Sequence, residues 1–127
     1  MPKHLTPAGV RPPFAAYSHA VEVEAGSRMV FCSGQLGISP DDVVPQDAGA
    51  QAELCFAAIG TILAAAGMTL GNVVRINAYV TAREHMKPYM AVRDRLFPAP
   101  SPASTLMIVT GFTREEFKVE VEVIAAA

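Results

Sequence analysis

The final stretch of the chain, residues 118–125, constrains the possible folds more than any other segment. Three valines occupy every second position there, and Glu120 and Glu122 stand between them. Because successive side chains of a β-strand point to opposite faces, this alternation predicts a strand with one buried face and one polar face. The chain must therefore build a sheet whose two faces meet different surroundings.

Four further segments have the alternation or the β-branched composition of strands. They cover residues 19–24, 28–33, 74–80 and 104–109. The turn sequence Ala25-Gly26-Ser27 separates the first two, so we expect these two strands to pair as a β-hairpin.

The longest predicted helix begins after Asp47, whose side chain can cap the first free N–H groups, and Gly67 is its expected stop. We place its end at about Ala66. Apolar residues at helical spacing predict a core-facing stripe along it. That stripe consists of Leu54, Ala58, Ile62 and Ala65, widened by Cys55, Ile59 and Ala66.

A second helix precedes Phe97, and its start is ambiguous. The sequence of residues 81–84 spells a capping box, but a start there would put Pro88 beyond the first turn, where proline costs about 3 kcal/mol. A start near Glu84 or His85 leaves this proline in the first turn. We therefore predict the later start.

The order of these elements predicts an α+β fold, in which two helices cover one face of a mixed sheet. The length of 127 residues suits one domain, so we expect residues 1–127 to form a single unit. The other face of the sheet carries both apolar and polar groups, among them Arg75, Tyr79 and Glu120. A face of this kind is typical of contact with other subunits.

Composition excludes several classes of protein. With 51% hydrophobic and 17% charged residues the chain is not intrinsically disordered, and its net charge of -2 argues against nucleic-acid binding. No apolar run approaches a membrane span or a signal peptide, so we expect a cytoplasmic protein without a membrane partner. Cys32 and Cys55 lie in apolar runs and are expected to be reduced core residues. The three histidines are scattered, so no metal is expected.

Few side chains offer chemistry, and each also has a structural interpretation. Glu120 is either part of a polar outer face or a partly desolvated carboxylate suited to acid–base chemistry. The polar break at residues 33–35, where we expect the second strand to end, is either a loop entry or a ligand-orienting element. The other candidates are Tyr17, Ser104 and Thr105. Taken singly, each favours the structural interpretation.

Taken together, these motifs resemble the RidA/YjgF family of small deaminases over essentially the whole chain. The resemblance rests on Ser33-Gly34-Gln35 combined with the Val-Glu-Val-Glu ending, supported by the segments 16–20, 65–67 and 73–74 and by Gln51. It implies a chorismate-mutase-like fold and a homotrimer whose sheets form a central barrel, with three clefts between subunits. It also implies hydrolysis of reactive imines and enamines, such as 2-aminoacrylate, without a cofactor.

Carried over by position, the resemblance assigns the catalytic role to Glu120, which helps to position water. It assigns substrate binding to Tyr17, Ser33, Gly34 and Gln35, and it places Met90, Ser104 and Thr105 in the same cleft. The chain departs from the family at two positions: Ser104 stands where active members carry the arginine that grips the substrate carboxylate, and Met90 where the archetype carries asparagine.

The departure at Ser104 limits the expected activity. A bidentate arginine–carboxylate contact contributes about 1.5–3 kcal/mol, so its loss lowers affinity for a small carboxylate roughly tenfold to over a hundredfold. Arg93, one turn beyond Met90, is a candidate replacement cation, although a solvated or structurally paired arginine is the interpretation we favour. We therefore predict a RidA-like hydrolase for another imine, enamine or related small metabolite. The alternatives are a non-catalytic ligand-binding or interaction trimer and, disfavoured by the charge, a ribonuclease or translation inhibitor.

Overall fold

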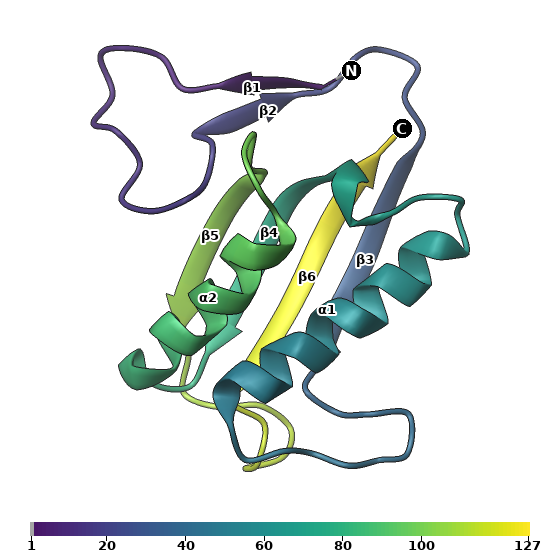
Figure 1. Ribbon diagram of the computed structural model, residues 1–127, viewed down its shortest axis with the longest axis vertical. Coiled ribbons are helices and arrows are strands. Elements are labelled where there is room, and N and C mark those ends of the chain that lie inside the picture. Colours follow the sequence, from purple (N-terminus) through teal and green to yellow (C-terminus); the bar gives the residue numbers. More distant parts are fainter. Residues whose placement is uncertain (1) are drawn as a thin grey trace.

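The computed structural model describes residues 2–127 and has two layers (Figure 1). Helices α1 (Ala48–Ala64) and α2 (Met86–Leu96) lie side by side over one face of a four-stranded sheet, and the opposite face carries no helix. The predicted α+β architecture is confirmed. The strands of the sheet, in spatial order, are β3 (Met29–Leu36), β6 (Val119–Ala126), β4 (Val73–Val80) and β5 (Ala103–Ile108).

The pairing of the strands explains the mixed character of the sheet. Strand β6 lies between β3 and β4 and is antiparallel to both, whereas β4 and β5 are parallel. A parallel pair needs a long crossover connection, and α2 supplies it between β4 and β5. Strands β3 and β5 are consequently the two edges of the sheet.

The predicted β-hairpin is wrong. Strand β2 (Ala20–Glu22) pairs instead with the amino-terminal strand β1 (Lys3–Leu5), as a separate two-stranded ribbon beyond one end of the main sheet (Figure 1). The turn does form, with Gly26 at φ +84°. The strand that follows it, β3, pairs with the carboxyl-terminal strand β6 and not with β2. The long apolar strand β6 offers β3 far more buried contact than the three residues of β2 can.

Both helices begin as predicted. The Asp47 side chain accepts a hydrogen bond of 2.8 Å from the Ala50 N–H, as an N-cap does. Helix α1 ends two residues earlier than expected, and Gly67 follows at φ +72°. A short 3₁₀ turn, η2 (Arg83–His85), precedes α2, so Pro88 falls in the first turn of the helix, where it removes no helical hydrogen bond.

The core lies between the helices and the alternating apolar residues of β4 and β6. The stripe predicted for α1 is displaced by one residue, because Leu54 is only half-buried and Ile62 is exposed. Alanine, leucine and isoleucine occur all around this helix, so the periodicity of its sequence does not fix which side is buried. The residues of α1 that are buried are Ala48, Gln51, Ala52, Cys55, Phe56, Ile59 and Leu63.

Both thiols are free and buried. Burial raises the pKa of Cys55 to about 12, and it raises the pKa of Cys32 as well, so neither is a thiolate at neutral pH. Among residues 2–127, no helix is both long and apolar enough to cross a bilayer. A cytoplasmic location stays a prediction.

Candidate functional site

The alternation along the carboxyl-terminal strand determines the face of the sheet on which Glu120 lies. Glu120 is the second residue of β6, and it lies opposite Leu36 on β3 and Tyr79 on β4. Its side chain therefore projects from the face of the sheet that carries no helix, which we call the open face. The carboxylate lies directly over Gly34, since a Cβ atom there would be 2.6 Å from Glu120 Oε2.

The surroundings of Glu120 make its ionisation less favourable than that of a carboxyl in water. The side chain is half-buried, and desolvation raises the pKa of the Glu120 carboxyl above its ordinary value, with a smaller contribution in the same direction from Glu122. Glu122 in turn accepts a hydrogen bond of 2.7 Å from the Tyr79 hydroxyl, and this bond is the main reason that the pKa of Tyr79 is raised. Two carboxylates and a phenol thus form one network on the open face.

Residues 33–35 form a bulge inside a strand. The expectation that they end the strand is wrong, because β3 continues to Leu36. Cys32 faces Val123 and Gln35 faces Val121, so β3 has one residue more than its partner over this step. The Gln35 side-chain amide donates to the Ser33 carbonyl at 3.1 Å. The bulge places the glycine of the motif beneath the Glu120 carboxylate.

The segment that contains Tyr17 lies against the start of β5, at the opposite edge of the sheet. Ser18 forms an isolated parallel bridge with Ala103, and its hydroxyl donates to the Ser101 carbonyl at 2.5 Å. Tyr17 itself is half-buried, and its hydroxyl accepts a 3.2 Å hydrogen bond from the Phe14 N–H. Tyr17 is thereby held one residue away from the bridge that joins Ser18 to the start of β5.

Ser104 and Thr105 point to different sides of the sheet. Ser104 pairs with Ile76, which is fully buried beneath the helices, and the Ser104 hydroxyl is buried without a hydrogen-bond partner among the described residues. Thr105 lies on the open face, where its hydroxyl accepts a 2.7 Å hydrogen bond from Arg75 Nη2. Only the threonine of this pair is thus presented on the open face.

The two positions singled out on α2 lie in the helix layer. Met90 is half-buried and packs against the core. Arg93 is 3% exposed, and its Nη2 lies 3.0 Å from the Asp94 carboxylate, with the guanidinium 5.9 Å from the centre of the Tyr89 ring. The favoured interpretation of Arg93 as a structurally paired arginine agrees with this position.

Within one protomer the candidate residues thus fall into two groups. Ser33, Gly34, Gln35 and Glu120 gather where β3 ends and β6 begins, whereas Tyr17, Ser104 and Thr105 gather where β5 begins. The edges β3 and β5 are three strand spacings apart, about 14 Å. Within one protomer, a small molecule is too short to reach from residues 33–35 on β3 to the residues at the start of β5.

A surface cavity of about 400 Å³ adjoins Glu120, and the loop before β6 forms its outer wall. Phe112 and Thr113 line this cavity together with Leu36 and Glu120. The sequence offers no signal for the first two, because residues 110–117 have neither strand nor helix periodicity. They come beside the carboxylate only because the loop folds back over the end of the sheet.

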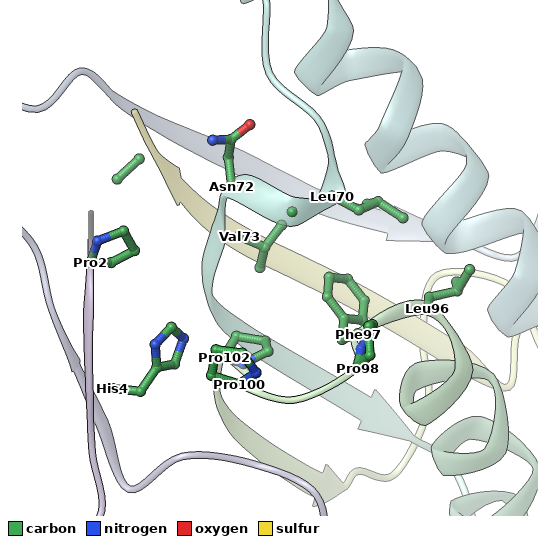
Figure 2. Close-up of a pocket in the computed structure, with 12 residues that line it drawn as sticks. Pro2, His4, Leu70, Asn72, Val73, Leu96, Phe97, Pro98, Pro100 and Pro102 are labelled. Atoms are coloured by element: carbon green, nitrogen blue, oxygen red, sulfur yellow. The ribbon is translucent and has the colours of Figure 1, made fainter.

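A larger cavity, of about 450 Å³, lies at the opposite end of the sheet and is lined by none of the predicted site residues (Figure 2). His4 of β1 and Asn72 of the short 3₁₀ turn η1 (Leu70–Asn72) supply polar side chains there. The rest of the wall is mainly apolar and rich in proline. The described residues that line this cavity include no acid–base pair comparable with Glu120 and Glu122.

Gln51 is a supporting residue of the site whose role the sequence does not disclose. It is fully buried in the first turns of α1, and its amide nitrogen donates to the carbonyls of Pro45 and Glu116, both at 2.8 Å. Its amide oxygen accepts a 2.8 Å hydrogen bond from the Lys118 N–H. One side chain thereby joins both loops at the end of the sheet where Glu120 lies.

Comparisons with known proteins agree with this architecture. The family model described as Endoribonuclease L-PSP matches residues 8–127. Protein DfrA of Myxococcus xanthus is 34% identical over 87% of this chain and 85% of its own length. The chloroplastic Reactive Intermediate Deaminase A of Arabidopsis thaliana is 31% identical over 86% of this chain and 57% of that protein.

Solved structures show the same fold. A Yersinia pestis protein of unknown function, described as YyfB of the conserved Rid family, superposes with a TM-score of 0.86 over 99% of this chain and 98% of its own, at 26% identity. The fold and the site define a class of small α+β proteins in which a carboxylate lies over a glycine in a strand bulge. The chain belongs to the RidA/YjgF family, whose model carries the Endoribonuclease L-PSP description, and this membership supports a RidA-type function.

Proposed function

We propose that this protein hydrolyses a reactive imine, enamine or related small metabolite in a cleft shared by neighbouring subunits of a homotrimer. The observation that carries the proposal is the half-buried Glu120 carboxylate, which lies over Gly34 beside a cavity. Family membership supports the reaction class. The opposite positions of the two residue groups support a cleft that two protomers build.

The proposed reaction needs little beyond positioning and a proton acceptor. The oxygen of a water molecule attacks the carbon of the protonated imine, and one water proton passes to Glu120. The nitrogen of the resulting carbinolamine takes the proton back from Glu120, and the C–N bond breaks to release ammonia. The remaining hydroxyl group then gives its proton to the ammonia, so that the carbonyl product and ammonium are left. A carboxyl whose pKa is raised is a stronger proton acceptor than an ordinary one, which suits Glu120 to this role.

The archetypal substrate 2-aminoacrylate is expected to react slowly. Ser104 carries no charge, and its hydroxyl is buried beneath the helices. The other residues proposed to shape the cleft are Tyr17, Ser33, Gly34, Gln35, Met90 and Thr105. We propose no cofactor, because water, a carboxylate and a proton are sufficient for this hydrolysis.

The test is to follow keto product from enzymatically generated 2-aminoacrylate and from larger imines, with wild type, Ser104→Arg and Glu120→Gln. We expect wild type to hydrolyse a larger imine, Glu120→Gln to lose most of that rate, and Ser104→Arg to gain on 2-aminoacrylate. Turnover by wild type that Glu120→Gln leaves unchanged would contradict the catalytic role of Glu120.

A non-catalytic ligand-binding trimer is the second candidate, and the replacement of the family arginine by Ser104 favours it. It is the correct function if wild type hydrolyses none of these compounds while Ser104→Arg acquires activity. Because the family description names an endoribonuclease, the same samples are incubated with RNA. We expect no cleavage that survives repurification, in keeping with the net charge of -2.

A further inference from the structure

Arg75 is an unusual residue in its setting. It is the only basic residue in the four strands of the main sheet, and it is half-buried on the open face of β4. Among the described residues, its guanidinium forms no ion pair with a carboxylate, and the bond to Thr105 is its one hydrogen bond. A guanidinium has five N–H donors, so most of this donor capacity is unused.

The bond to Thr105 also prepares the threonine hydroxyl as a donor. The Thr105 oxygen accepts from Arg75 at 2.7 Å, and its own hydrogen remains free to donate. A guanidinium and a hydroxyl side by side match the two oxygens of a carboxylate. Thr105 directly follows Ser104, the position at which the family arginine is missing.

The acidic residues of the same face complete the arrangement. In the register of the sheet, Asn77 of β4 lies between Thr105 on β5 and Glu122 on β6. Thr105 and Glu122 are therefore two strand spacings apart, about 10 Å. A substrate between them would form one hydrogen bond of about 2.8 Å at each end. About 4–5 Å of the distance then remains for the substrate itself, which is the length of a skeleton of three to five carbons.

We propose that Arg75 and Thr105 form an anion subsite on the open face, which binds the carboxylate of a small substrate whose nitrogen-bearing end points toward Glu122, two residues from Glu120 on the same face of β6. This inference rests on the proposed function and defines its substrate class. The charged part of the carboxylate anchor thus lies on Arg75 of the inner strand β4 and not at position 104 of the edge strand β5. The preferred substrate accordingly differs from 2-aminoacrylate in the distance between its anionic group and its reacting carbon.

The test compares two probes that differ only in the carboxylate, 4-oxopentanoate and 2-pentanone, in which the carbonyl carbon is separated from that group by two methylenes. Binding is measured by calorimetry on the full-length protein, with the state of assembly followed by light scattering. We expect wild type to bind the keto acid in preference to the ketone. Arg75→Gln should weaken binding of the keto acid about ten- to a hundredfold, and Arg75→Lys less, because the charge remains but the fork is lost.

The controls separate a binding role from a structural one. Arg83→Gln, which removes an exposed arginine of η2, should change neither probe's affinity, whereas Thr105→Val should weaken only the keto acid. In an imine assay, Arg75→Gln should raise KM with little change in kcat. Three results would overturn the proposal. The first is that wild type binds both probes equally, and the second is that Arg75→Gln binds the keto acid as tightly as wild type does. The third is that Arg75→Gln and Arg75→Lys lose assembly while each protomer keeps its affinity for the keto acid.

These outcomes also separate this inference from the proposed function. If 4-oxopentanoate binds through Arg75 but no imine is hydrolysed, the anion subsite stands and the hydrolase proposal fails. If an imine is hydrolysed at the same rate and KM by wild type and Arg75→Gln, the hydrolase proposal stands and the anion subsite fails.

Discussion

At the scale of single residues, the contact between Glu120 and Gly34 organises the candidate site. The carboxylate occupies the space that any other residue at position 34 would fill with its Cβ atom. Burial and, to a smaller extent, the neighbouring Glu122 raise the pKa of Glu120, so its ionisation is less favourable than that of a carboxyl in water. A side chain that lowers stability in its ionised form is typical of a functional site, where activity and stability compete.

The raised pKa of Glu120 makes a prediction about stability and pH. A carboxyl whose folded-state pKa is raised contributes stability below its unfolded pKa, and that contribution is lost as pH rises through the folded pKa. Glu120→Gln removes the ionisation, so this variant should have a higher Tm than wild type at pH 7. The difference should vanish near pH 4, and an equal difference at both pH values would refute this account.

Gly34→Ala should reduce activity without unfolding the protein. The added methyl group meets the flexible end of Glu120, so the carboxylate moves while the backbone stays in place. We expect imine hydrolysis to fall at least tenfold and Tm to change little. The matched control is Gly60→Ala within α1, which has open space and should stabilise by about 0.5–1 kcal/mol. A fully active Gly34→Ala protein would contradict the assigned geometry.

Glu120 itself was predictable from the sequence, but its contact with Gly34 was not. Alternation along β6 places both glutamates on one face, and this needs no knowledge of any partner strand. The position of Gly34 depends on a bulge in β3, and a one-residue change of register reverses the facing of every later side chain. No pattern within residues 33–35 indicates that β3 has one residue more than β6 over this step.

At the scale of elements, α1 does more than cover the sheet. Through Gln51 it binds the loop that precedes it and the loop that leads into β6. Gly37 leaves room for this contact, since a Cβ atom there would lie 2.3 Å from Gln51 Cβ. The helix, the end of β3 and the start of β6 are thus fastened together next to Glu120.

Gln51→Ala should be strongly destabilising. It removes a fully buried side chain and leaves two partly buried carbonyls and one partly buried N–H without their side-chain partner, which should lower the free energy of unfolding by about 2–4 kcal/mol. Chemical denaturation measures this loss. Gln46→Ala, which removes an exposed amide nearby, is the matched control and should stay within about 0.5 kcal/mol of wild type. Similar losses in the free energy of unfolding for the two variants would rule out the assigned role of Gln51.

Local signals identified the elements better than their partners. Asp47 and Gly67 mark the ends of α1, and Pro88 marks the start of α2, because caps and proline act within one turn. The pairing of β2 with β1 depends on three residues at the start of the chain that have no alternation to reveal them. The buried side of α1 was misplaced because Ile62 and Phe56 are both large and apolar, and only the sheet decides between them.

At the scale of the whole molecule, the open face combines a polar centre with apolar edges. Phe31 on β3 is 73% exposed and Met107 on β5 is 54% exposed, and both project from this face. Exposed side chains of this size at both edges of one sheet suit contact between copies, in which the β3 edge of one protomer meets the β5 edge of the next. Such closure would also bring together the two separated groups of candidate residues.

Phe31→Asp is therefore expected to convert a trimer into monomers. A carboxylate in a buried contact is unfavourable unless it is paired, and one substitution acts at all three symmetry-related contacts. Light scattering should give three times the protomer mass for wild type and one for the variant, with circular dichroism unchanged. Val43→Asp, an equally drastic change at a 60% exposed loop residue away from the sheet, should remain trimeric. Because the proposed cleft is shared by two protomers, the monomer should also lose imine hydrolysis, and a fully active monomer would place the whole site within one chain.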